Sequence, residues 1–316
     1  MGKSRGLYRL GAAALLLLLL TANGNAFNQY VIGAMVWDLS VPFYAKFIKG
    51  LNDGAVKYNL NLLIRDGRNN PTTQNAVIRR FIAEKVNLIL VAPGYAQPIV
   101  PALQHANEAG IPVLAVNNKI DEGVAVVTFV GADDSYFGKQ QAKLLIQAIG
   151  KSGKVGYLMG ALGTSAQSMR KKGFDNYLKD YPLIKIVACQ TEDWDSAKAL
   201  IITQELLSQY KKGELQAIVC QGPEGLLGAQ FAANSGRAEV KFILGDYPAS
   251  VKKAIQNGIV YGTVNQDPYP QAVEGMHMAL LYLTGNKSEI PSPHYYLELP
   301  LVTRRNVFYF APAWND

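Results

Sequence analysis

Short apolar runs alternate with amphipathic stretches along most of this 316-residue chain, and the whole succession occurs twice. The apolar runs have the length of strands, and no linker rich in glycine, proline or serine separates the first succession from the second. Strands that alternate with helices are typical of a parallel sheet that helices cover on both faces. The pattern therefore predicts two similar α/β units that lie directly against each other, with a cleft between them as the favoured ligand site.

The expected strands and helices follow from the apolar runs and from the turn residues between them. In the first unit we expect strands at 30–37, 61–66, 87–92, 112–117 and 126–131, and helices at 43–58, 72–84, 97–109 and 135–149. In the second unit we expect strands at 154–159, 184–189, 216–220, 240–245 and 260–264, and helices at 166–179, 195–209, 224–235, 249–257 and 269–284.

The stretch from Tyr30 to Tyr44 indicates where a ligand would bind. Its apolar start is typical of a strand buried on both faces, and Asp38 and Pro42 then mark a loop before a helix. Phe43 and Tyr44 fall in the first turn of that helix. Two aromatic rings are thus expected at the carboxyl end of a buried strand, which is the edge where open α/β sheets bind ligands.

Residues 1–26 have the organisation of a secretory signal peptide. A basic start precedes a short apolar core over Ala12–Leu20, and the small residues Gly24 and Ala26 follow. The apolar core is too short to span a bilayer, and no cysteine that could carry a lipid anchor lies near the expected cut. We expect cleavage near Ala26 and an exported mature protein that begins near Phe27.

The charge of the chain does not indicate a nucleic-acid partner. The formal net charge is +7, but the first 26 residues hold three basic residues and no acidic one, which leaves 28 basic against 24 acidic residues beyond them. Beyond residue 26 the basic residues occur singly or in separate short runs, among them the pairs Arg79–Arg80, Lys171–Lys172, Lys211–Lys212 and Arg304–Arg305. We interpret these pairs as solvated surface and expect no nucleic-acid binding.

Cys189 and Cys220 are the only cysteines. In a doubly wound unit with strand order 2-1-3-4-5, they end the second and third strands, and one strand lies between those two. Their Cα atoms would then be about 10 Å apart, beyond the roughly 7 Å that a disulfide spans. We expect two buried free thiols.

Common catalytic and metal-binding patterns are absent beyond residue 26. This part of the chain has no Gly-x-Ser-x-Gly elbow, no Gly-x-x-x-x-Gly-Lys loop and no Gly-x-Gly-x-x-Gly fingerprint. His105, His277 and His294 lie far apart, outside any cluster with metal-ligand spacing. We therefore expect no enzymatic activity, no cofactor and no metal.

Four segments together resemble the periplasmic ribose-type sugar-binding proteins of ABC importers, which have the type I periplasmic binding protein fold. The segments are VPFYAKFIKGLNDGAVKYNLNLLIRDGRNNP at 41–71, GADDSYFGKQQAKLLIQAI at 131–149, GTSAQSMRKKGF at 163–174 and LPLVTRRNV at 299–307. The likeness runs in register over essentially all of 30–307. It implies two Rossmann-like, doubly wound lobes with parallel sheets, joined by a three-crossover hinge near 131–134, 266–268 and 296–299. The first lobe would comprise 27–132 and 267–297, and the second 133–266 and 298–316.

The resemblance also implies a set of ligand-binding residues. At matched positions stand the aromatic residues Phe43 and Tyr44, the hydroxyl donor Arg170, the stacking residue Trp194, the acceptor Asp246 and the amide Gln266. This set suits a sugar, because a sugar ring has apolar C–H faces that pack on aromatic rings and a rim of hydroxyls that polar side chains can bond.

Five positions depart from the pattern of ribose binders. An Asn-Asn pair replaces an Asp-Arg pair, and apolar or small residues replace three asparagines; the positions are Asn117, Asn118, Val41, Ala92 and Gly222. A site that lacks the partner of a ligand hydroxyl discriminates strongly against that ligand. The departures therefore argue for a ligand other than ribose, with compensating contacts expected from Trp37, Asp38 and Asn117.

The function that the resemblance implies is that of an exported, periplasmic, monomeric substrate-binding protein, which delivers a small neutral sugar or cyclic polyol to the membrane permease of an ABC importer. An alternative is a periplasmic sensing protein that presents a sugar-like signal to a membrane kinase or chemoreceptor. The sequence does not separate the two. The aromatic tail at 308–316 lies outside the family pattern and is expected to pack on a lobe.

Overall fold

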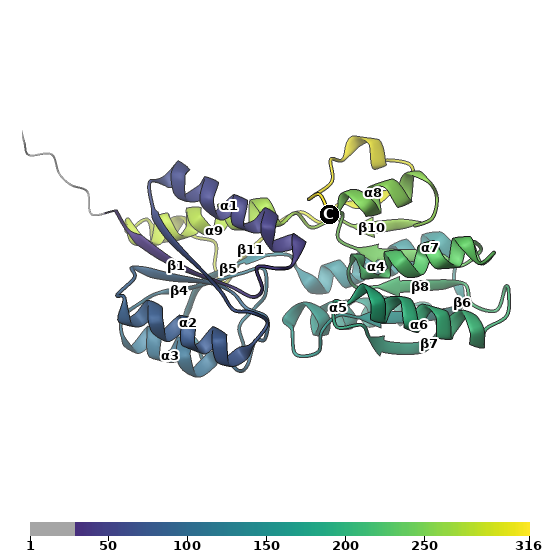
Figure 1. The fold of residues 1–316 in the computed structure, drawn as a ribbon, viewed down its shortest axis with the longest axis horizontal. Coiled ribbons are helices and arrows are strands. Elements are labelled where there is room, and N and C mark those ends of the chain that lie inside the picture. The colour runs from purple at the N-terminus through teal and green to yellow at the C-terminus, as the bar shows by residue number, and fades with distance from the viewer. Residues whose placement is uncertain (1–28) are drawn as a thin grey trace, which may run out of the picture.

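The computed structural model describes residues 29–316, which form two lobes, each built on a six-stranded sheet (Figure 1). In spatial order the first sheet comprises β11 (His294–Tyr296), β5 (Val126–Gly131), β4 (Val113–Val116), β3 (Leu88–Ala92), β1 (Val31–Val36) and β2 (Asn61–Asp66). The second comprises β12 (Leu301–Thr303), β10 (Gly262–Val264), β9 (Lys241–Gly245), β8 (Ala217–Cys220), β6 (Ser152–Met159) and β7 (Leu183–Thr191). The expected signal peptide at 1–26 lies outside the described residues.

Helices cover both faces of each sheet. The first sheet carries α1 (Pro42–Tyr58) and α9 (Pro268–Leu283) on one face and α2 (Pro71–Ala83) and α3 (Val100–Glu108) on the other. The second carries α4 (Asp134–Ile149) and α5 (Ser165–Leu178) on one face, and α6 (Ser196–Gln209), α7 (Leu226–Asn234) and α8 (Ala249–Gln256) on the other. The described residues also form three short 3₁₀ helices, η1 (Pro223–Gly225), η2 (Lys287–Glu289) and η3 (Val307–Tyr309). No helix within 29–316 has the length and apolar character that a membrane crossing requires.

Strand β1 shows why the apolar runs become central strands. Ile32, Ala34 and Val36 belong to the cluster with α1 and α9, whereas Met35 faces the cluster with α2 and α3. Side chains alternate between the two faces of a strand, so a strand covered on both faces has to be apolar throughout. The burial of one such large side chain stabilises the fold by about 1.5–3 kcal/mol.

The chain passes from one sheet to the other three times within the described residues. It leaves the first sheet after β5, returns to the first lobe between β10 and α9, and leaves again between β11 and β12. In both sheets the first five strands have the order 2-1-3-4-5, and the described strand pairs are parallel except for β10 with β12. The predicted fold of two doubly wound α/β lobes is thus confirmed.

The sixth strand of each sheet was not predicted from the sequence. Strands β11 and β12 have three residues each, too short for a recognisable period. Strand β11 joins the edge of the first sheet directly before the last crossing, and β12 joins the edge of the second sheet directly after it. These two strands place the last segment of the chain beside the junction of the lobes.

The prediction of two buried thiols was wrong for one of them. Both cysteines are free, and Cys220 is buried, but Cys189 is exposed. Cys189 lies on β7, the outermost strand of the second sheet, where one long side has no neighbouring strand. An edge strand is covered less completely than a central one, which explains the exposure of this thiol.

Candidate functional site

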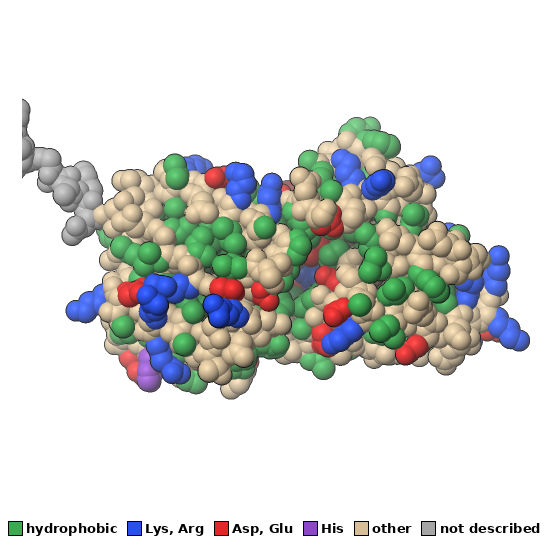
Figure 2. Space-filling view, in the orientation of Figure 1, with side chains coloured by type: hydrophobic (Ala, Val, Ile, Leu, Met, Phe, Trp, Pro, Cys, Tyr) green, Lys and Arg blue, Asp and Glu red, His purple; other side chains and the backbone are tan. Residues whose placement is uncertain are grey.

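A cavity of about 640 Å³ lies between the lobes, and residues from both lobes line it. Figure 2 shows the hollow between the lobes, with acidic side chains along it. Eight of the nine predicted ligand-binding residues line this cleft, namely Trp37, Phe43, Tyr44, Asn117, Arg170, Trp194, Asp246 and Gln266.

Asp38 is the predicted residue that the structure does not place in the lining of the cleft. Its carboxylate accepts hydrogen bonds from the backbone N–H of Ser40 at 2.9 Å and from the Ser40 hydroxyl at 2.6 Å. These bonds close the turn between β1 and α1. Asp38 therefore shapes the loop that carries the aromatic residues.

The first lobe contributes a wall of packed aromatic rings. The rings of Phe43 and Tyr44 meet edge to face with centroids 5.2 Å apart, and Trp37 meets Tyr44 in the same way at 6.3 Å. The indole N–H of Trp37 donates to the side-chain oxygen of Asn69 at 2.7 Å. Pro42 begins α1, so the rings of Phe43 and Tyr44 lie in the first turn of this helix.

A chain of hydrogen bonds holds the polar atoms of this wall. The Tyr44 hydroxyl donates to the Asn117 side-chain oxygen at 3.0 Å, and the Asn117 amide donates to Gln271 at 3.2 Å. The Gln271 amide in turn donates to Gln266 at 3.5 Å. Burial raises the pKa of Tyr44 far above its usual value, so this hydroxyl stays neutral and can act as a donor.

Arg170 is the charged centre of the second lobe's side of the cleft. Its guanidinium donates to the Asp134 carboxylate at 2.9 Å and to the backbone carbonyl of Gln221 at 2.8 Å, and it lies 3.8 Å from the centre of the Phe137 ring. Burial alone would lower the pKa of Arg170, but the negative charges of Asp134 and Asp246 raise it above its usual value. Arg170 is therefore a fixed cation whose charge Asp134 balances.

Asp246 and Trp194 carry polar atoms that have no hydrogen-bond partner among the described residues. These atoms are one carboxylate oxygen of Asp246 and the indole nitrogen of Trp194, and both are buried. Burial raises the pKa of Asp246 to about 6, although the charge of Arg170 and a hydrogen bond from Gln266 act in the opposite direction. A buried polar atom without a partner costs about 1–3 kcal/mol, so such atoms favour a ligand that can bond nearby.

Backbone conformation also marks this site. Asn117, Trp194 and Asp246 have positive φ angles of 68°, 59° and 59°. The left-handed region is uncommon for residues other than glycine, above all for a bulky one such as tryptophan. Strained backbone of this kind tends to occur at functional sites, and here it coincides with three of the predicted ligand-binding residues.

Glu224 lines the cleft and was missed by the sequence analysis. A Cβ atom on Gly222 would lie 2.0 Å from its Oε2 atom, so the carboxylate occupies space that any side chain at position 222 would need. Burial raises the pKa of Glu224 to about 7. Its position in the sequence could have identified it, because Glu224, like Phe43, lies at the start of a helix that follows a buried strand.

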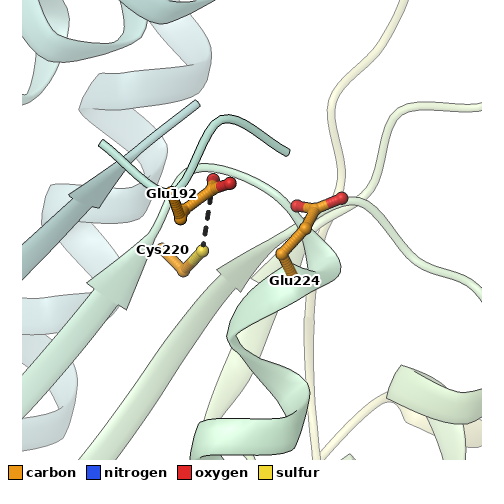
Figure 3. Close-up of side chains that lie close together, drawn as sticks. All are labelled: Glu192, Cys220 and Glu224. Carbon is orange, nitrogen blue, oxygen red and sulfur yellow. Dashed lines mark hydrogen bonds between the residues drawn. The ribbon is translucent and has the colours of Figure 1, made fainter. Parts of the chain in front are cut away.

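Behind Glu224, two further side chains form a small buried cluster (Figure 3). The Cys220 thiol donates to the Glu192 carboxylate at 3.8 Å, and the backbone N–H of Asp195 donates to the other carboxylate oxygen at 3.1 Å. Burial and the neighbouring Glu224 raise the pKa of Glu192 to about 9. The side-chain oxygens of Glu192 and Glu224 and the sulfur of Cys220 lie within 4.8 Å of one another. The hydrogen bonds that Glu192 accepts lower its pKa, but burial outweighs them, so this carboxyl keeps its proton at neutral pH.

The fold and the cleft define a class: two-lobed α/β proteins that bind a small molecule between their lobes. A family described as "Periplasmic binding protein domain" matches residues 32–287, and the chain belongs to this family. The resemblance found in the sequence is thereby confirmed.

Individual relatives agree with this assignment. The ribose import binding protein of Salmonella typhimurium is 28% identical over 286 residues, which cover 90% of this chain and 94% of that protein. A xylitol-binding protein of Mycolicibacterium smegmatis is 28% identical over 94% of this chain and 84% of its own length. A periplasmic solute-binding protein of an ABC transporter from Actinobacillus succinogenes, solved with bound D-allose, matches with a TM-score of 0.80 at 27% identity over 89% of this chain and all of that one.

Proposed function

We propose that this chain is the substrate-binding protein of an ABC importer and binds a small neutral sugar or cyclic polyol between its lobes. The observation that carries the proposal is the cleft itself, which has aromatic rings on both sides and buried polar groups between them. Phe43 and Trp194 suit the apolar faces of a hydroxylated ring, and Arg170, Asp246 and Gln266 suit its hydroxyl rim. The relatives named for ribose and xylitol, and the one solved with D-allose, support the same ligand class.

The contacts on the first lobe support a ligand other than ribose. The Asn118 amide donates to the Pro93 carbonyl at 2.9 Å, and Asn117 is already bonded to Tyr44 and Gln271. Val41, which also lines the cleft, offers no polar side-chain atom. This side of the cleft therefore has fewer free groups for ligand hydroxyls than a site built from charged side chains.

The mechanism is capture by closure, without chemistry on the ligand. The lobes, taken as 27–132 with 267–297 and 133–266 with 298–316, rotate about the three crossings of the chain. A ligand stabilises the closed form only through contacts that exist in that form, which is why residues on both lobes are required. In this proposal the protein is exported, loses its signal peptide near Ala26, acts as a monomer in the periplasm and delivers its ligand to a membrane permease.

A thermal-shift panel of pentoses, hexoses and polyols tests the proposal. A ligand at about 100 times its Kd adds about 2.7 kcal/mol to the free energy of unfolding, so at least one sugar or polyol should raise the Tm clearly. Trp194→Ala should remove that rise, and amino acids in the same panel should give none. A flat response to every sugar and polyol, or a response to amino acids alone, contradicts the proposal.

A further inference from the structure

The last residues of the chain dock beside the cleft on the second lobe. The Ala313 N–H donates to the Tyr247 carbonyl at 2.8 Å, and the Ala249 N–H donates to the Trp314 carbonyl at 3.0 Å. Trp314 also forms an isolated parallel bridge with Pro248. Figure 1 places the C-terminus at the junction of the two lobes. The tail thus adds a strand-like segment to the loop that follows Asp246.

The end of the tail is also held through a side chain. The Asp316 carboxylate accepts hydrogen bonds from the Ser250 N–H at 3.1 Å and from the Ser250 hydroxyl at 2.5 Å. Together with the backbone bonds, these contacts fix the main chain on either side of Trp314. The position of the Trp314 side chain therefore follows from the docking of the tail.

The Trp314 side chain reaches from the second lobe to the aromatic wall of the first. It is only 6% exposed and meets the ring of Phe43 edge to face, with centroids 5.4 Å apart. It packs in the same apolar cluster as Trp37, Tyr44 and Phe43 and lines the cleft beside them. By contrast, Phe308 and Tyr309 in the same tail are 75% and 86% exposed, so burial is a property of Trp314 and not of every aromatic residue there.

We propose that Trp314 is a ligand-contacting, specificity-determining residue and that the tail forms a third wall of the cleft. The inference rests on the proposed function and deepens it. The indole offers an apolar surface beside Phe43 and at the same time reduces the space at that end of the cleft. It therefore strengthens binding of a monosaccharide or small cyclic polyol and excludes ligands that extend further, such as disaccharides.

Two effects separate this role from simple interlobe packing. If Trp314 contacts the ligand and limits the size of ligand that fits, removing the indole weakens binding of the small ligand. Removing it also brings the affinities for the small ligand and for a larger one closer together. If it served only to hold the lobes together, its loss would weaken all ligands by the same factor. The ratio of two dissociation constants therefore distinguishes the two roles.

The experiment is isothermal titration of full-length mature protein with the best monosaccharide or polyol of the panel and with a disaccharide that contains it. Trp314→Ala should raise the Kd of the small ligand at least tenfold. The ratio of the disaccharide Kd to the small-ligand Kd should fall at least threefold. Trp314→Phe should stay within about threefold of the wild type for the small ligand. Tyr309→Ala, an exposed aromatic residue of the same tail, should match the wild type.

Circular dichroism and the Tm of each variant show whether it folds. If Trp314→Ala does not fold, Trp314→Leu carries the test, because leucine keeps apolar contact with Phe43 but lacks the indole; it should shift the ratio in the same direction. An unchanged ratio in the folded variant overturns the inference while leaving the proposed function intact. A wild-type protein that binds no sugar or polyol overturns the proposed function and this inference with it.

Discussion

The two sides of the cleft differ in how their polar atoms are partnered. On the first lobe, Tyr44 and Asn117 are linked through Gln271 to Gln266 by hydrogen bonds within the protein. On the second lobe, Trp194, Glu224 and Asp246 each keep a buried polar atom that lacks a partner among the described residues. The first side is thus a prebuilt apolar surface, whereas the second has hydrogen-bonding capacity left for a ligand. We infer that the first lobe contributes mainly packing and the second lobe contributes most of the recognition of ligand hydroxyls.

The largest expected effect comes from removing the fixed cation of the second side. Arg170→Met leaves Asp134 buried without its ion-pair partner, which should lower the free energy of unfolding by about 3–5 kcal/mol. Urea denaturation measures this loss. Lys198→Met, which removes an exposed ion pair with Asp193 on the same lobe, should leave the denaturation midpoint unchanged. Equal effects of the two variants would show that the Arg170 pair has no special structural role.

The next effect concerns pH and Glu224. Because the pKa of this carboxyl is raised from 4.5 to about 7 in the folded protein, the folded state binds more protons than the unfolded state between these values. The contribution of Glu224 to stability is therefore present at low pH and is lost as the pH rises towards 7, by at most about 3 kcal/mol. Glu224→Gln should be more stable than the wild type at pH 7.5 and no more stable at pH 4.5. If the difference in urea midpoint between Glu224→Gln and the wild type is the same at pH 4.5 and at pH 7.5, the pKa of Glu224 is not raised.

A smaller effect is expected on ligand affinity from Asp246. Its carboxylate is an acceptor for ligand hydroxyls, and a hydrogen bond to a charged group contributes about 1.5–3 kcal/mol. Asp246→Asn should therefore weaken the best ligand of the panel about 10- to 100-fold in calorimetry, with the Tm of the ligand-free protein unchanged or raised. Wild-type affinity in this variant would show that the Asp246 carboxylate does not bind the ligand hydroxyls.

The smallest effect is expected on the first side. Tyr44→Phe keeps the ring but removes the hydrogen bond to Asn117, which should cost about 0.5–1.5 kcal/mol of stability. Ligand affinity should change less than in Asp246→Asn, because the Tyr44 hydroxyl is already bonded within the protein. A loss of affinity larger than that of Asp246→Asn would reverse the comparison between the two sides.

Much of the fold followed from the sequence because central strands of a parallel sheet are apolar throughout and their helices are amphipathic. That pattern predicted the first five strands of each sheet. The matched motifs predicted six residues that line the cleft, and Trp37 and Asn117 were expected there as compensating contacts. The exposure of Cys189 depended on which strand forms an edge of the sheet, which its local pattern does not show. Asp38 stood at the right strand end, but its carboxylate bonds Ser40 in the turn instead of facing the cleft.

Glu224 and Trp314 show where sequence reasoning ended. The position of Glu224 depends on the absence of a side chain at Gly222, a contact between two residues that no periodicity describes. The position of Trp314 depends on the docking of the tail against Tyr247 and Ala249, more than sixty residues away in the sequence. Both residues enter the cleft through tertiary contacts, which an analysis of local patterns cannot supply.

The most direct test of the central claim is a crystal structure of the mature protein with the best-binding sugar or polyol of the panel. We expect one ligand molecule in the cleft, with its ring between the aromatic residues of the two lobes and its hydroxyls bonded to Arg170, Asp246 and Gln266. A ligand bound outside the cleft, or in the cleft without contact to the second lobe, would contradict the account.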